Sequence, residues 1–188
     1  MQTKQIQKEL VNGVDVPKLT QIIDELTQTP DLAQFNFCAK NNWVSGGENQ
    51  TTVNEFYCGG VKHVRSKPFV FTKDEPTVLL GHDHGANPVE YALTALAGCV
   101  TTTLVYYASA MNVKINKVES TLEGDIDLRG LLNIDENIKA GYKNINVKFK
   151  IDSDASPETL HKLIEIAKKH SPVANTITNA TPINVSLA

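Results

Sequence analysis

Cysteine is the residue most able to do chemistry in this chain, which holds three of them, at positions 38, 58 and 99. A cysteine thiolate is a nucleophile, and it can attack the O–O bond of a peroxide. The odd number and the wide spacing are not typical of a disulfide framework, and no C-x-x-C pair of a zinc ribbon or thioredoxin-like motif is present. We therefore expect free thiols in a reducing compartment, with no cofactor.

Cys99 lies in an apolar segment that is predicted to be a helix from Pro88 to about Ala110, with Asn87 as its cap. Because this helix is apolar on most sides, it should be buried. Cys99 is then either a nucleophile or a small buried residue that packs the helix. It stands about three turns from the helix start, so the helix dipole contributes little to lowering its pKa. A nearby cation is needed, and Arg65 is the candidate.

Glu90 and the loop before the helix hold further candidates. Glu90 could position a substrate or orient an arginine, or it could simply suit the positive end of the helix dipole. The loop contains His82 and His84, whose alternation is compatible with metal binding, but no third ligand is identifiable and no metal site is expected. A place for His84 at a pocket mouth and a plain solvated loop both stay open.

Helices and strands must position these residues, and the sequence predicts them in separate groups. Helices are expected at Asp15–Gln28, 88–110 and 156–170, the last with Ser156 as cap and Pro157 in its first turn. Strands are expected at 34–44, 51–57, 69–71, 113–124, 141–151 and 182–187. Strands grouped apart from helices are typical of an α+β fold with antiparallel sheets.

Composition narrows the possible partners of the chain. It has 188 residues and a formal net charge of -3, which argues against nucleic acid or an anionic membrane as the main partner. No apolar run approaches the roughly 20 residues of a membrane span, and the first residues lack a signal-peptide core. We expect a soluble, cytoplasmic protein.

The segment from Gly85 to Cys99, which reads GANPVEYALTALAGC, resembles the signature of the OsmC/Ohr family of osmotically inducible and organic hydroperoxide resistance proteins. Two further stretches fall where that family has them: Asp74-Glu75-Pro76 before the signature and the run that begins Ser171-Pro172-Val173 after the last helix. The resemblance covers residues 33–188. Residues 1–32 are then a helical N-terminal extension.

The resemblance implies an OsmC-like fold with a long buried central helix and an intertwined homodimer. It also implies reduction of organic hydroperoxides by two cysteines, the first of which corresponds to Cys99. The second corresponds to Ser171, so a disulfide cannot form there. The family's glutamate corresponds to Val89, and Glu90 comes one residue later, about 100° around the helix. The family's thiolate-holding arginine has Arg65 as its candidate here.

Two hypotheses of function follow from these residues. In the first, the chain is a thiol-dependent peroxidase of the oxidative stress response, with Cys99, Glu90 and Arg65 as catalytic residues. His84 and Ser171 would contact the hydroperoxide, and an external thiol would act as reductant. In the second, the same fold is a non-catalytic module that binds a small apolar ligand or senses redox state. The sequence identifies neither the physiological substrate nor the reductant.

Overall fold

The computed structural model describes residues 10–187, which form two compact units. The first unit contains residues 15–92, and the second contains residues 10–14 and 93–187. The long helix α2 (Pro88–Ala110) contributes to both, because the division falls between Ala92 and Leu93. The predicted boundary between residues 32 and 33 stays a prediction.

The first unit begins with the predicted N-terminal helix, α1 (Val16–Gln28), which is followed by the 3-10 turn η1 (Pro30–Ala33). Asp15 caps α1, since its Oδ1 accepts a hydrogen bond of 3.1 Å from the backbone N–H of Lys18. Pro17 stands in the first turn, where its missing N–H leaves no helical hydrogen bond unmade. The prediction of a helix over Asp15–Gln28 is confirmed.

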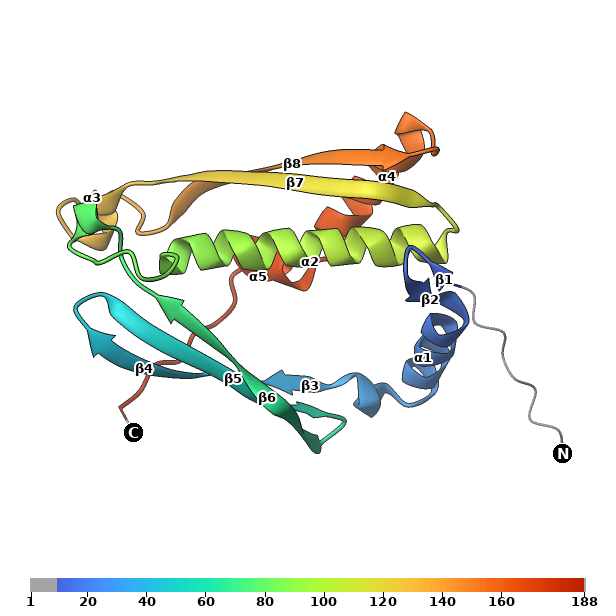
Figure 1. Cartoon of the computed structure of the whole chain (residues 1–188), viewed down its shortest axis with the longest axis horizontal. Helices are drawn as coiled ribbons and strands as arrows, with labels where there is room; N and C mark the ends of the chain where they lie inside the picture. Colours follow the sequence, from blue (N-terminus) through green and yellow to red (C-terminus); the bar gives the residue numbers. More distant parts are fainter. Residues whose placement is uncertain (1–9, 188) are drawn as a thin grey trace, which may run out of the picture. The chain divides into compact units, whose positions relative to one another are not determined.

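The first unit continues with an antiparallel sheet built around one long strand, β5 (Glu48–Cys58). The strands β3 (Phe35–Phe37) and β4 (Lys40–Ser45) pair in succession with β5, and β6 (Val61–Lys73) also pairs with it (Figure 1). The predicted strand 34–44 is thus divided in two. On β4, Trp43 is 74% exposed and its Nε1–H donates to the carbonyl oxygen of Gly46 over 3.0 Å.

Strand β6 is much longer than the predicted strand 69–71. The chain turns back at Gly59 and Gly60, whose φ angles of 54° and 79° suit a two-residue hairpin turn. These glycines therefore continue the pairing rather than end it. The length of β6 escaped prediction because its first half is rich in lysine, histidine and arginine, which hide the alternation of a strand.

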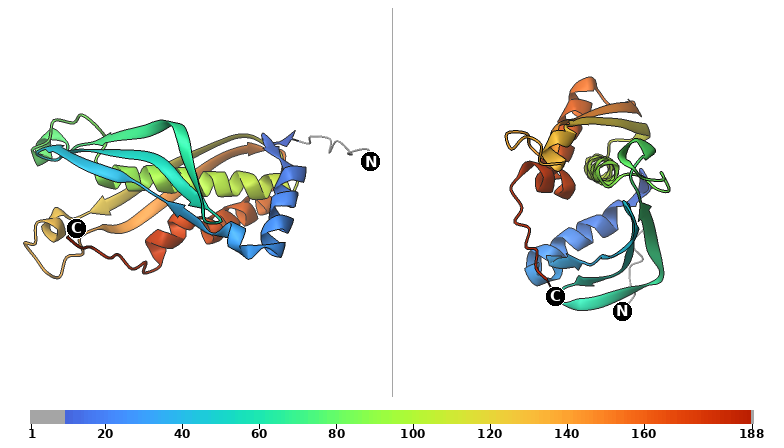
Figure 2. Two further views of the ribbon diagram at one scale, coloured as in Figure 1. Left: turned by 90° about the horizontal axis from the view of Figure 1, so that it is seen from below. Right: turned by 90° about the vertical axis from the view of Figure 1, so that its left-hand side faces the viewer.

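The second unit is a hairpin packed against helices. Its strands β7 (Ile115–Ile126) and β8 (Tyr142–Ser153) pair antiparallel, and α2 and α4 (Pro157–His170) pack beside them (Figure 2). Among the described residues, the fully buried hydrophobic side chains all lie on α2 and α4, and they form the core. They are Leu96, Val100, Leu104, Ala108, Leu163 and Ala167. Both predicted strands and the predicted helix 156–170 are confirmed.

Helix α2 is buried along one stripe, not on all sides. Its hydrophobic residues Leu96, Val100, Leu104 and Ala108 recur every fourth position and are buried, whereas Ala95, Thr102 and Tyr106 are exposed. The helix is long and apolar enough to cross a membrane by length and composition alone. Its buried stripe belongs to the packed core of the second unit.

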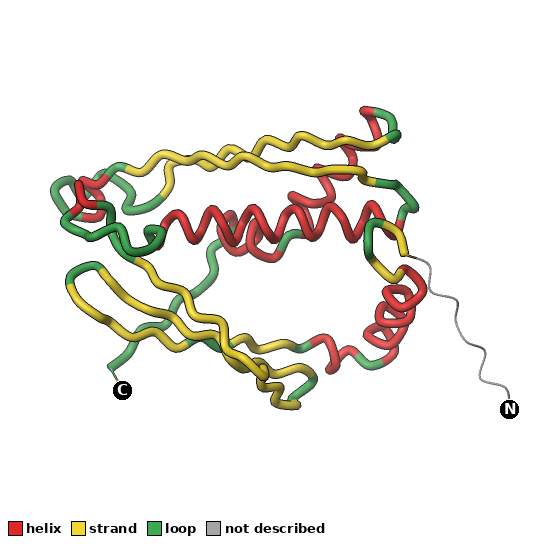
Figure 3. The backbone as a smooth tube through the Cα atoms, in the orientation of Figure 1, coloured by secondary structure: helices red, strands yellow, loops and turns green. Residues whose placement is uncertain are grey.

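Shorter elements complete the second unit. They are a two-stranded sheet of β1 (Leu10–Val11) and β2 (Val14–Asp15), the short helix α3 (Leu128–Leu131), and the helix α5 (Pro172–Thr178). The strand predicted at 182–187 is wrong, because residues 179–187 have no regular structure (Figure 3). Ile183, Val185 and Leu187 do alternate, but all three are exposed and no strand of the described chain pairs with them.

Candidate functional site

Cys99 stands in the middle of α2, in the second unit, as a half-buried free thiol. Its backbone carbonyl accepts a hydrogen bond of 2.8 Å from Thr103 Oγ1. Within the second unit as described, no side chain forms a hydrogen bond with its sulfur. An added Cβ at the preceding residue, Gly98, would meet no atom within 4 Å. The surface of α2 beside the thiol is therefore open within this unit.

Glu90 takes part in the cap of α2. Its Oε2 accepts a hydrogen bond of 2.8 Å from the backbone N–H of Asn87, whose own Oδ1 accepts one of 2.9 Å from the N–H of Val89. This reciprocal pair is a capping box, and the carboxylate also lies at the positive end of the helix dipole. The shift of one position relative to the family's glutamate therefore brings Glu90 to the place where a cap needs it.

Asp74 organises the loop that leads into α2. Its side chain is fully buried, and its two oxygens accept the backbone N–H groups of Glu75, His82 and His84 over 2.8, 2.9 and 3.3 Å. Burial alone would raise the pKa of Asp74, but these three hydrogen bonds together hold it below its ordinary value. At Gly81, an added side chain would collide with the backbone of Glu75, so the loop depends on that glycine.

His84 is held by this loop beside Glu48 of β5. Its Nδ1 lies 3.0 Å from Glu48 Oε2, and this hydrogen bond raises the pKa of His84. The ring of His84 also stacks on that of His82, with centroids 5.4 Å apart. The predicted pocket-mouth role of His84 stays a prediction.

The ligand atoms of Glu48, Asp74 and His84 all lie within 4.8 Å of one another, as in metal-binding groups. The group joins His84 to two carboxylates and does not include His82. The three side chains already have hydrogen-bond partners. Asp74 accepts three backbone N–H groups of the loop, and His84 pairs with Glu48. Their arrangement is thus explained by loop structure.

Arg65, the cation predicted for the site, lies on β6 in the first unit. Its guanidinium carbon lies 5.1 Å from the ring centroid of Phe56 and 5.5 Å from that of Phe69. Its Nη1 is buried and has no hydrogen-bond partner in the described part of the chain, and the same holds for Oδ1 of Asn54 on β5. An unpaired buried N–H is costly, so this group has room for a further hydrogen-bond acceptor.

Ser171 is fully buried at the junction of α4 and α5. Its Oγ caps α5 by accepting a hydrogen bond of 3.2 Å from the backbone N–H of Ala174, and Pro172 follows in the first turn. Its predicted contact with substrate stays a prediction. The other two cysteines lie in the first unit, where Cys38 Sγ donates to Asn36 Oδ1 and Cys58 Sγ lies 3.7 Å from the carbonyl oxygen of Leu32.

The predicted site residues are thus divided between the units. Arg65, His84 and Glu90 belong to the first unit, and Cys99 and Ser171 belong to the second. The sequence does not predict the part played by Asp74, although the Asp74-Glu75-Pro76 stretch belongs to the family resemblance. Nor does it predict Asn54, since an asparagine inside a strand gives no distinctive signal.

A pocket of about 540 Å³ lies entirely within the second unit, and sequence reasoning did not find it either. Its walls come from α2, β8, α4, α5 and the loop before β8. Apolar side chains of strand and helices form its floor, and lysines from three elements stand among its lining residues. Neither Cys99 nor Ser171 lines it.

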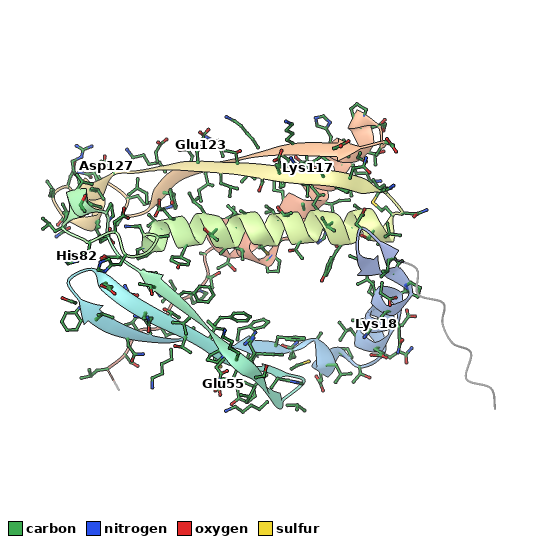
Figure 4. The ribbon with its side chains drawn as sticks, in the orientation of Figure 1. Lys18, Glu55, His82, Lys117, Glu123 and Asp127 are labelled. Atoms are coloured by element: carbon green, nitrogen blue, oxygen red, sulfur yellow. The ribbon has the colours of Figure 1, made fainter. Side chains whose placement is uncertain are left out.

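The second unit also carries an exposed charge cluster at the end of β7, where Figure 4 shows Asp127 beside α3 and Glu123 on the face of the hairpin away from α2. Arg129 donates to Asp127 over 2.6 Å, and Lys143 lies 3.3 Å away. The hydrogen bonds from Arg129 hold the pKa of Asp127 well below its ordinary range.

Comparison with known proteins identifies the family. Residues 81–186 match the family model described as OsmC-like protein, and the chain therefore belongs to the OsmC-like family. A search of curated proteins found no match.

Solved structures support the fold. An OsmC-like protein from Mycoplasma pneumoniae is 19% identical with a TM-score of 0.60, over 76% of this chain and 87% of that one. An OsmC-like protein of unknown function from Vibrio cholerae is 13% identical with a TM-score of 0.56, over 75% and 92%. An organic hydroperoxide resistance protein from Legionella pneumophila is 17% identical with a TM-score of 0.51, over 76% and 88%. The α+β, OsmC-like fold expected from the sequence is thus confirmed.

Proposed function

We propose that this chain is a one-cysteine, thiol-dependent peroxidase that reduces organic hydroperoxides through Cys99. Membership of the OsmC-like family supports the proposal, as does the likeness in fold to a Legionella protein named for organic hydroperoxide resistance. The observation that carries it is Arg65, a guanidinium beside two aromatic rings whose buried Nη1 lacks a partner. A thiolate at that nitrogen would supply an acceptor for it, and the cation would favour the charged form of the thiol.

In the proposed reaction, the Cys99 thiolate attacks the terminal oxygen of the hydroperoxide. An S–O bond forms as the O–O bond breaks, and the departing alkoxide takes a proton and leaves as an alcohol, so that Cys99 becomes a sulfenic acid. Because Ser171 replaces the second cysteine, an external thiol condenses with the sulfenic acid and releases water. A second external thiol reduces this mixed disulfide and restores Cys99. The external thiols thus supply both electrons.

The remaining predicted residues have supporting roles in this proposal. Glu90 positions the substrate from the capped end of α2, and His84 and Ser171 contact it. The compartment is proposed to be the cytoplasm, where external thiols are kept reduced.

We further propose that the protein works as a homodimer. Among the described residues of the first unit, no hydrophobic side chain is fully buried. Its sheet instead displays an aromatic face, which we define as Phe35, Phe37, Phe56 and Phe69, and Phe37 is 71% exposed. A sheet with an uncovered apolar face needs another layer, and a second copy of the chain would supply it.

The test is turnover of cumene hydroperoxide by the purified protein with dithiothreitol as reductant. Cys99→Ser should abolish turnover, whereas Cys38→Ser and Cys58→Ser, the matched controls, should retain it. Dimedone should add to the wild type after peroxide treatment and not to Cys99→Ser. Arg65→Gln should lower turnover by about tenfold or more and shift the pH profile of Cys99 alkylation upward, because the thiolate loses its cation. Turnover that survives in Cys99→Ser, or none in the wild type, would reject the peroxidase.

A second candidate function is a ligand-binding or redox-sensing module of the same fold. The pocket of the second unit favours it, since this pocket is built without Cys99. A wild type that forms the dimedone adduct without turning over would favour the sensing form of this candidate.

A further inference from the structure

We propose that the pocket of the second unit binds a monoanionic amphiphile, a carboxylate with a hydrocarbon tail. This inference goes beyond the peroxidase, because it involves neither the thiol nor the cation of that reaction. The volume of about 540 Å³ falls within the roughly 300–1,000 Å³ of small-molecule sites. All the lining residues belong to one compact unit, so the pocket is complete without the first.

The floor of the pocket selects for a hydrocarbon. It is formed by inward-facing residues of β8 together with residues of three helices: Leu96, Val100, Val147, Phe149, Ile164 and Ile177. On β8 the residues Ile145, Val147 and Phe149 alternate with exposed polar ones, so one face of the strand is apolar throughout. Ile177 remains 44% exposed, and an apolar tail laid in the pocket would remove its surface from water.

The rim of the pocket selects for negative charge. Lys139, Lys143 and Lys168 come from the loop, the strand and α4, and Glu165 is the one acidic residue among the lining. Lys143 is already paired with Asp127 at 3.3 Å. Lys139 and Lys168 have no ion-pair partner in the chain from residue 10 to 187. The two unpaired lysines would bind the charged head of an amphiphile, and the apolar floor would bind its hydrocarbon tail.

The charge balance points to a monoanion. Lys143 is engaged by Asp127, which also pairs with Arg129, and Glu165 is the acidic residue among the lining beside Lys139 and Lys168, so these two lysines and the glutamate leave one positive charge for a ligand. A carboxylate carries one charge and accepts hydrogen bonds from both lysines. A phosphate monoester would bring up to two charges close to Glu165.

The test is isothermal titration calorimetry of the full-length protein with decanoate, below the concentration at which decanoate forms micelles. Saturable binding is expected, with decanol weaker by about tenfold because it lacks the charge. Lys139→Ala combined with Lys168→Ala should weaken decanoate binding by about tenfold, with less effect of added salt than in the wild type. Lys148→Ala is the matched control, since Lys148 is an exposed lysine of β8 that lies near Glu123 and not in the pocket.

Further variants separate this site from the proposed peroxidase. Ala174→Trp should fill the pocket and abolish binding, and circular dichroism shows whether that variant folds; the lysine variants change only exposed side chains. Cys99→Ser should bind decanoate as the wild type does, so that loss of turnover and loss of binding are independent. No saturable binding, equal affinity for decanol, tighter binding of decyl phosphate, or an equal loss in Lys148→Ala would each overturn the proposal.

Discussion

The side-chain amide of Asn12 donates a hydrogen bond to Ser109 Oγ over 3.1 Å, although 97 positions separate these residues in the sequence. The same amide donates to the carbonyl oxygen of Val113 over 2.9 Å, and its oxygen accepts from the N–H of Ile115 over 2.8 Å. Asn12 has a φ of 52°, a conformation that asparagine adopts more readily than most residues. One side chain therefore fastens the turn between β1 and β2 to the end of α2 and the start of β7.

Asn12→Ala should lower the free energy of unfolding by about 2–3 kcal/mol, because it leaves three polar groups of the second unit without their partner. Urea unfolding measures the loss. Asn137→Ala is the control, since its side chain bonds only to Asp135 in the same exposed loop, and it should cost less than about 0.5 kcal/mol. Equal losses in the two variants would show that Asn12 does not fasten the turn.

Asp74→Asn should lower the melting temperature by roughly 5–10 °C, because an amide cannot accept all three backbone N–H groups of the loop. Since the folded-state pKa of Asp74 is depressed, its contribution is present above the ordinary pKa of about 3.9 and is lost as the pH falls through the folded-state value. The difference between variant and wild type should therefore narrow in acid. Asp83→Asn, in the same loop, is the control and should melt as the wild type does.

The pKa of His84 should lie above the ordinary value of about 6.5 and return to it in Glu48→Gln, because its main cause is the hydrogen bond to Glu48. The stabilising effect of this pair is present below the ordinary histidine pKa and is lost as the pH rises through the folded-state value. An NMR titration of the histidine ring protons measures both pKa values. A His84 pKa that does not respond to Glu48→Gln would disprove the assignment.

Leu104→Ala and Leu163→Ala should each lower the free energy of unfolding by about 3–5 kcal/mol, because both side chains are fully buried in one core cluster of α2 and α4. Leu131→Ala, at a side chain that is 67% exposed, should cost less than about 0.5 kcal/mol. Urea unfolding compares the three variants. A cost at Leu163 as small as that at Leu131 would mean that α4 does not share the core.

Phe37→Asp should reduce the mass of the protein in solution toward that of one chain, because it places a charge on the aromatic face that we propose a second copy covers. Light scattering after size exclusion measures the mass. Lys67→Asp, also on the first unit's sheet and already polar, is the control and should leave the mass unchanged. A wild type with the mass of a single chain would rule out the homodimer.

Local sequence signals were sufficient to predict most elements of this fold. Capping residues such as Asp15 and Ser156 act within a few positions, so the starts of α1 and α4 could be predicted from the residues beside them. The length of β6 could not, because its pairing depends on β5 and not on its own polar composition. The strand expected at 182–187 failed for the same reason: alternation alone does not supply a neighbouring strand.

The candidate site was less predictable than the fold. The position of Cys99 on α2 follows from the helix pattern, and the capping role open to Glu90 follows from its place three residues after Asn87. The unpaired Nη1 of Arg65 depends on rings that stand elsewhere on the sheet, and the pocket lysines come from three separate elements. The spacing of residues along the sequence does not predict which distant residues become neighbours in the fold.

Trp43 is the single tryptophan of the chain, and it lies in the first unit on β4. Its intrinsic fluorescence therefore reports on that unit, while the far-ultraviolet helix signal comes mainly from α2, α4 and α5, with a smaller part from α1. Denaturation followed by both optical probes distinguishes one cooperative transition from two. If the two curves separate, the emission of Trp43 will follow the unfolding of the sheet that contains Arg65 independently of the helix that contains Cys99.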